Sequence, residues 1–134
     1  MATGWQPTYN GGSTDGFVMK LSPDGLNITN GSYIGTPNYD QAYFVEIDRA
    51  NNVYLLGQSL GGAFPVFNAG FVNPNSSQFV MKLDSNLAIL TNSTQFGNGT
   101  STSTNISPSA FWLISVGIFI YQVGVQISFK DQFF

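Results

Sequence analysis

The stretch FVMKL at residues 17–21 occurs a second time, without any change, at residues 79–83, which begin 62 residues later. A turn-forming segment follows each copy: SPDG at residues 22–25 and DSN at residues 84–86. Self-similarity at a fixed spacing is the sequence signature of proteins built from repeated structural units. We therefore expect the fold to be assembled from copies of one unit.

Each copy of FVMKL is predicted to be the first strand of a β-hairpin. Valine and phenylalanine fit a pleated sheet, and the Pro23-Asp24-Gly25 segment favours a tight turn, because proline fixes φ and glycine takes the left-handed position. The return strands are expected at about residues 26–34 and 87–96. A strand, a turn and a second strand are therefore expected twice.

A second type of hairpin is predicted between the two copies. AYFVEI at residues 42–47 and VYLLG at residues 53–57 are rich in strand-forming residues, and DRANN at residues 48–52 forms the turn, with an asparagine at positive φ. Two hairpins per repeat make four strands, which is one blade of a β-propeller. The predicted fold class is therefore all-β, with antiparallel four-stranded blades of an incomplete propeller.

The composition excludes several classes of function. The chain of 134 residues has a formal net charge of −3 with only four Lys and Arg residues, so it lacks the basic surface that nucleic-acid binding requires. It has no cysteine and no histidine, which excludes disulfides, thiol catalysis and histidine-based catalytic or metal sites. The start of the chain lacks the basic and apolar regions of a signal peptide.

The repeat resembles a known family. The segments DGFVMKLSPDG, AYFVEIDRANNVYLLGQS and FPV, within about residues 7–110, resemble the SBBP-type bacterial β-propeller repeat, although Asn51 stands where that family usually has glycine. Long surface proteins of gliding bacteria, often with a gliding-motility-associated C-terminal sorting domain, carry such repeats. The resemblance implies an extracellular or cell-surface location and a non-catalytic binding or structural role, with neighbouring blades and an unknown protein or glycan as partners.

The chain is too short to close a propeller. Closure needs about four to eight blades, and residues 1–110 supply one to one and a half, so we expect partial sheets with exposed apolar faces. By alternation, nine residues are predicted to form the core. These are Phe17, Met19, Leu21, Val45, Ile47, Tyr54, Phe79, Met81 and Leu83.

The tail at residues 111–134 differs in character, because residues 111–129 contain no charged residue. Three interpretations are open. The first is a base lost near Phe111, which leaves residues 112–134 out of frame: restoring it allows LVDQCGNIYISGWGANILQG, where Asp, Asn, Tyr and Gly follow the spacing of Asp48, Asn52, Tyr54 and Gly57. The second is a transmembrane helix, for which about 20 apolar residues suffice, and the third is a native strand pair.

The search for chemistry gives no site. Of the seven carboxylates, Glu46 and Asp48 are closest in sequence and could form a glycosidase pair, but we expect Asp48 to bond to the backbone amides of its own turn. Asp48 with Asn51 and Asn52, or Asp84 with Asn86, offers oxygen ligands for calcium but does not match a calcium-binding loop. We therefore predict no catalytic, cofactor-binding or metal-binding residue.

The predicted function is a fragment of a secreted or cell-surface β-propeller repeat protein that serves as a binding or structural scaffold and is not an enzyme. One alternative is a membrane-anchored surface protein with a C-terminal transmembrane helix. Another is a piece of a propeller-fold hydrolase or lyase whose catalytic residues lie elsewhere. Tyr33, Tyr39, Tyr43 and Tyr54 could stack on sugar rings, but cross-strand packing is the favoured explanation.

Overall fold

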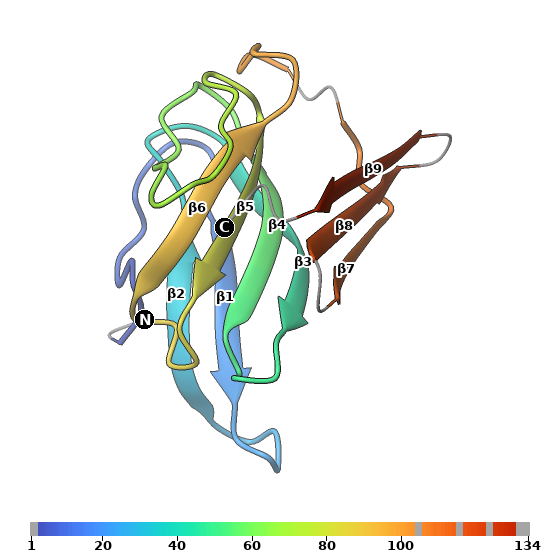
Figure 1. Ribbon diagram of the computed structural model, residues 1–134. Coiled ribbons are helices and arrows are strands. Elements are labelled where there is room, and N and C mark those ends of the chain that lie inside the picture. Colours follow the sequence, from blue (N-terminus) through green and yellow to red (C-terminus); the bar gives the residue numbers. More distant parts are fainter. Residues whose placement is uncertain (1–2, 104–105, 115–116, 123–124, 131–134) are drawn as a thin grey trace.

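The computed structural model describes residues 3–103, 106–114, 117–122 and 125–130, and within them the chain is all-β with antiparallel sheets, as predicted. The sheets have the orders β1-β2, β3-β4-β5-β6 and β7-β8-β9 (Figure 1). The strands are β1 (Gly16–Leu21), β2 (Ile28–Ile34), β3 (Asp40–Ile47), β4 (Val53–Ser59), β5 (Gln78–Leu83), β6 (Leu90–Phe96), β7 (Ala110–Ile114), β8 (Gly117–Gln122) and β9 (Val125–Lys130).

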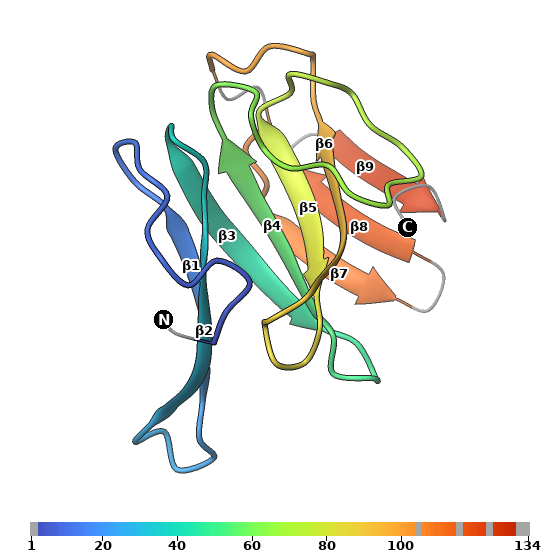
Figure 2. The ribbon, with the colours of Figure 1, turned by 90° about the vertical axis from the view of Figure 1, so that its left-hand side faces the viewer.

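The three sheets are arranged as layers, with the four-stranded sheet in the middle. Figure 2 shows the β1-β2 hairpin on one side of this sheet and the β7-β8-β9 sheet on the other. All seven residues of β4 are buried, because each of its faces is covered by another layer. A central strand covered on both sides loses the alternation of apolar and polar residues that marks a half-exposed strand.

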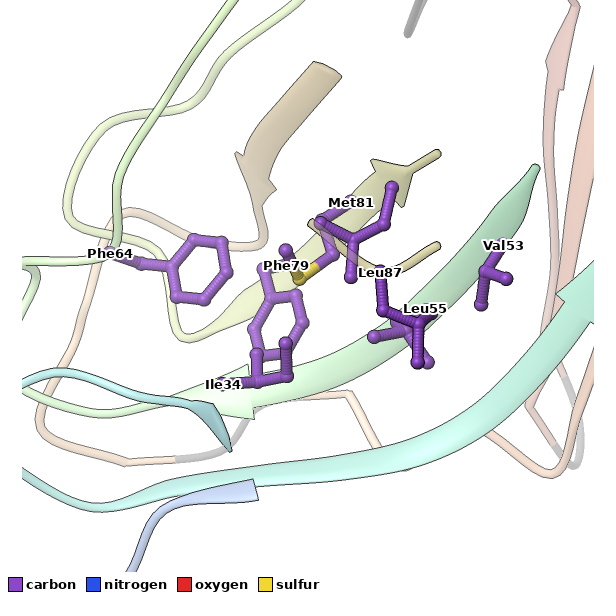
Figure 3. Close-up of a cluster of buried hydrophobic side chains, with 8 residues drawn as sticks. Ile34, Val53, Leu55, Phe64, Phe79, Met81 and Leu87 are labelled. Atoms are coloured by element: carbon purple, nitrogen blue, oxygen red, sulfur yellow. The ribbon is translucent and has the colours of Figure 1, made fainter. Parts of the chain in front are cut away.

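One face of the four-stranded sheet packs toward the β1-β2 hairpin. Ile34 of β2 joins this cluster, and Phe64 from the loop after β4 stacks on Phe79 of β5 with ring centroids 4.0 Å apart (Figure 3). Gly57 lies opposite Phe79, and a Cβ atom there would lie 2.4 Å from the ring. The whole buried cluster is Ile34, Val53, Leu55, Phe64, Phe79, Met81, Leu83 and Leu87.

The opposite face packs toward the β7-β8-β9 sheet. Phe111 of β7 and Ile120 of β8 are 4% and 1% exposed, and they complete a second buried cluster. Its other members come from the four-stranded sheet: Tyr54, Leu56, Val80 and Phe96. The middle sheet therefore contributes side chains to two separate cores.

The sequence repeat is also a structural repeat. Every residue pair of the β1-β2 hairpin has a counterpart 62 residues later in the β5-β6 hairpin, from Gly16↔Ile34 and Gln78↔Phe96 onward. Even the bulge recurs, after Lys20 in one hairpin and after Lys82 in the other. The two predicted hairpins and their turns are therefore confirmed.

The turn residues also follow the predictions. Gly25 has φ of 74° and Asn51 has φ of 64°, so both occupy the left-handed region. In the second copy of the first turn the equivalent of Gly25 is Leu87, with φ of 61°. Leu87 is 1% exposed within the first core cluster, and its burial compensates for a backbone conformation that is costly for a leucine.

The predicted core needs correction. Tyr54 and the three residues of the second FVMKL copy are buried, as predicted: Phe79, Met81 and Leu83. The prediction was wrong for five residues, which are 40% to 61% exposed: Phe17, Met19, Leu21, Val45 and Ile47. Alternation identified the apolar faces of β1 and β3, but Phe17, Met19 and Leu21 alternate with Val18, which packs against the four-stranded sheet, and so they face away from it. Val45 and Ile47 lie on the face toward the β1-β2 hairpin, which leaves them more than half exposed.

The tail contains strands in the residues that the structure describes. Residues 110–114, 117–122 and 125–130 form an antiparallel meander of three strands, β7-β8-β9, where the strand interpretation had a pair and the transmembrane interpretation a helix. Among the described residues no helix is long and apolar enough to cross a membrane. The lost base near Phe111 stays a prediction, which the nucleotide sequence tests directly: a reading frame without the restored hairpin would contradict it.

The repeat provides a matched pair of substitutions. Met81 is 0% exposed and Met19, its counterpart, is 40% exposed. We expect Met81→Ala to lower the free energy of unfolding by about 2–5 kcal/mol, because it leaves a cavity in a closed core. Met19→Ala should cost less than about 1 kcal/mol. Urea denaturation followed by circular dichroism measures the free energy of unfolding of both variants. Equal losses of stability would contradict the assignment of Met81 to the core and of Met19 to the surface.

Candidate functional site

The turn between β3 and β4 is organised around Asp48. Its Oδ1 atom accepts hydrogen bonds from the backbone N–H groups of Ala50 and Asn52, both at 2.9 Å, and its Oδ2 atom accepts one from the Asn52 side chain at 2.8 Å. Lys82 adds an ion pair at 3.7 Å. Desolvation acts against the charged form, but these hydrogen bonds and Lys82 outweigh it and lower the pKa of Asp48. The expectation that Asp48 bonds to its own turn is confirmed.

The turn between β5 and β6 uses Asp84 in the same way. Its Oδ1 atom accepts hydrogen bonds from the backbone N–H groups of Ala88 at 2.7 Å and Ile89 at 2.8 Å, and its Oδ2 atom accepts one from Asn86 at 3.2 Å. Partial desolvation opposes the charged form, yet the backbone donors prevail and lower the pKa of Asp84. In the first repeat copy Ser22 occupies this position, and its hydroxyl accepts from the Asn27 N–H at 3.1 Å.

These contacts show how the two turn carboxylates are used in the fold. The oxygens of Asp48 and Asp84 already accept hydrogen bonds from amides of their own turns, so they serve the backbone. Glu46 lies on β3, at the edge of the four-stranded sheet, opposite Tyr54. Among the described residues no three Asp or Glu side chains come together as metal ligands.

A polar end of the sheet is a feature that the sequence did not indicate as a site. Gln41, Gln58 and Gln78 lie side by side on three strands, and Gln78 is 0% exposed. Tyr43 donates a hydrogen bond to the Oε1 atom of Gln58. Asp40, 1% exposed, accepts from the Thr36 N–H and hydroxyl at 2.6 and 2.8 Å.

Loops cover this polar end. The Leu60 N–H donates to the Tyr39 carbonyl, and the Ser59 N–H donates to the Ser77 carbonyl, each at 2.9 Å. Because Gln78 and Asp40 are buried beneath these loops, a ligand outside the molecule cannot reach them. The side-chain amide of Gln78 and the Oδ1 atom of Asp40 have no hydrogen-bond partner among the described residues, so this buried polar end is only partly satisfied.

The tyrosines considered as a sugar-binding surface do not form one group. Tyr33 makes an edge-to-face contact with Tyr9, with centroids 6.3 Å apart. Tyr39 donates to the Gln41 side chain at 2.8 Å, and Tyr54 is buried beneath Lys82, whose Nζ lies 5.0 Å from the ring centroid. The burial of Tyr54 agrees with the cross-strand packing explanation, whereas Tyr39 bonds to a residue two positions along the chain and Tyr33 contacts a residue that precedes β1.

The accessible candidate site is an apolar groove between β1 and β3, which we call the β1-β3 groove. The two strands are close at Gly16, where a Cβ atom would lie 2.7 Å from the Ala42 backbone nitrogen. Farther along β1 they separate, and the space between them measures about 540 Å³. The residues that line it are Val18, Met19, Lys20, Leu21, Val45, Ile47, Asn51, Val53, Ser85 and Leu87.

The groove combines two properties of a protein-binding surface. Val45 and Ile47 on its β3 wall are 55% and 61% exposed, so apolar surface is accessible there. The β1 wall is a strand that pairs, among the described residues, with β2 alone, so its other edge presents backbone donors and acceptors. The groove therefore offers both main-chain and apolar side-chain contacts.

In comparison with known proteins, no family model matches this chain and no curated protein sequence matches it.

The carboxylates of Asp48 and Asp84 should make the stability of the fold depend on pH. The pKa values of Asp48 and Asp84 lie below the ordinary value of 3.8, so both groups stabilise the fold fully above that value and lose this contribution as the pH falls through the folded-state pKa. We expect the urea concentration at the midpoint of unfolding to decrease as the pH is lowered from about 5 to about 2.

Asp84→Asn should lower the midpoint at neutral pH and flatten its acid dependence, because the substituted turn no longer gains from ionisation. Glu46→Gln is the matched control, since it removes one carboxylate from β3 without touching these turns. An acid dependence unchanged by Asp84→Asn would show that the turn is not responsible.

Proposed function

We propose that this chain is a non-catalytic part of a secreted or cell-surface β-propeller repeat protein that serves as a binding or structural scaffold. Residues 1–110 are its partial propeller region, in which β3 to β6 form one blade and the β1-β2 hairpin is the outer half of the blade before it.

The observation that carries the proposal is the repetition of one hairpin in two layers. The β1-β2 and β5-β6 hairpins share their register and bulge, and they belong to adjacent sheets that pack face to face through the Ile34-Phe79 cluster. Radial repetition of stacked four-stranded sheets is the construction principle of propellers. In such proteins each unit buries its apolar faces against its neighbours.

The chemistry of the chain supports a non-catalytic role. The sequence has no histidine and no cysteine, and Asp48 and Asp84 are used by their own turns. The accessible groove is lined mainly by apolar side chains, which suit binding better than proton transfer.

The resemblance to SBBP-type repeats supports a location outside the cell or on its surface. A protein or a glycan is then the class of external ligand, and neighbouring blades are the internal partners. The net charge of −3 argues against nucleic acid.

Tandem proteins made from residues 16–77 test the proposal, because this stretch is one complete period. If the units are blades, the urea midpoint should rise as copies are added and level off when the ring closes, with a monomeric mass at each stage. Light scattering after size-exclusion chromatography measures the mass, and circular dichroism measures the midpoint.

The matched control carries Gly57→Val in each copy. In the chain itself a side chain there would meet the Phe79 ring and the Gln41 carbonyl. In the tandem proteins Phe17 of the next copy takes the position of Phe79, so the substitution should prevent neighbouring copies from completing a four-stranded sheet. A midpoint independent of copy number would contradict the blade organisation.

A further inference from the structure

The two copies of FVMKL have the same sequence and the same hairpin register but different surroundings. Phe79 and Met81 of β5 are 0% exposed, whereas Phe17 and Met19 of β1 are 54% and 40% exposed. β5 pairs with β6 on one edge and with β4 on the other, while β1 pairs, in the described chain, with β2 alone. The copies therefore differ in a neighbouring strand as well as in the layer that covers Phe79 and Met81.

The structure shows what kind of strand fits such an edge. β4 lies antiparallel to β5, with Leu56 opposite Val80 and Tyr54 opposite Lys82. Subtracting the repeat distance places the same residue types opposite Val18 and Lys20 of β1. The sequence VYLLG, from residues 53 to 57, is therefore the template for a strand on the edge of β1.

The β1-β3 groove fits the side chains of that strand. Val18 points toward the four-stranded sheet, because it packs against the first core cluster. A leucine opposite Val18 lies on the same face of the hairpin. Its side chain would enter the groove beside Val45 and Ile47, whose exposed apolar surface it would cover.

The other face of the incoming strand is determined in the same way. In the β4-β5 pair Gly57 lies opposite Phe79 and leaves room for its ring. An incoming strand of the same pattern therefore places a glycine opposite Phe17. It also places a leucine opposite Met19, where it extends the apolar surface of β1.

We propose that the open edge of β1 accepts an antiparallel strand of the VYLLG pattern, which seats in the β1-β3 groove and completes the sheet by strand addition. The inference rests on the proposed repeat scaffold for the source of that strand, which is a β3-β4 type hairpin of another repeat. The partner is thus a polypeptide segment, recognised by its main chain and by two apolar side chains.

A synthetic peptide with the sequence of residues 40–59, labelled with fluorescein, is the probe. Added to the full chain, it should bind saturably with one peptide per chain, as fluorescence anisotropy measures. Hydrogen exchange should show new protection of β1 amides in the complex. A peptide with Leu55→Pro should bind at least about tenfold more weakly, because proline cannot donate to the ladder and disrupts the strand.

Chain variants locate the site. Val45→Asp in the full chain places a charge on the groove wall and should weaken binding at least about tenfold, because the charge would have to be desolvated. Val66→Asp, at a residue 44% exposed in the loop after β4, is the matched control and should leave the affinity unchanged. Circular dichroism of both variants verifies that they remain folded.

Three outcomes would overturn the inference. The first is the absence of saturable peptide binding, and the second is peptide binding that Val45→Asp does not weaken. The third is protection of β1 amides that rises with the concentration of the chain in the absence of peptide, because this result would assign the edge to a second copy of the chain. Tandem proteins that gain stability while the peptide fails to bind would refute only this inference. If the tandem proteins gain no stability but the peptide binds, the blade organisation fails and strand acceptance remains.

Discussion

The two central strands of the middle sheet, β4 and β5, bury side chains on both faces, and the remaining structure supplies the cover. On one face Ile34 and Phe64 close over Leu55 and Phe79, and on the other Phe111 closes over the sheet. A fully buried side chain of this size contributes about 1.5–3 kcal/mol relative to an exposed one. Sheets stacked face to face are therefore the constraint on which the fold depends.

The same constraint explains why identical sequences have different environments. FVMKL forms the same hairpin twice, with the same bulge, because local pairing needs only the hairpin. Its burial depends on layers and strands that lie elsewhere in the chain. Phe79 gains both Gly57 and Phe64 as neighbours, whereas Phe17 has its apolar ring on an open face. Position in the stack, and not sequence, decides which copy belongs to the core.

The sequence predicted the local structure well. The hairpins, the left-handed residues Gly25 and Asn51, and the use of Asp48 by its turn all follow from residue types within a few positions of each other. Alternation could not decide whether the apolar faces of β1 and β3 are covered, because coverage depends on other layers. The β1-β3 groove escaped prediction for the same reason, since its walls are about 25 residues apart in the chain and meet only after the sheets pack.

We infer the function from the surfaces that the fold leaves accessible. The turn carboxylates serve the backbone of their own turns, and the polar end of the sheet is buried. The β1-β3 groove is accessible and lies beside a strand edge, and we propose that it accepts another polypeptide segment. The proposed scaffold and the proposed acceptance of a strand both rest on one architecture, in which sheets are stacked face to face.

The central claim is that β1 and β5 are the same strand of one repeated unit, with strands on both edges of β5 and, among the described residues, on only one edge of β1. Amide hydrogen exchange of the full chain, resolved by residue with NMR, tests it most directly. If the claim is correct, β5 amides exchange only through global unfolding, while the β1 amides that do not pair with β2 exchange orders of magnitude faster. Equal protection of Val18–Lys20 and Val80–Lys82 would contradict it.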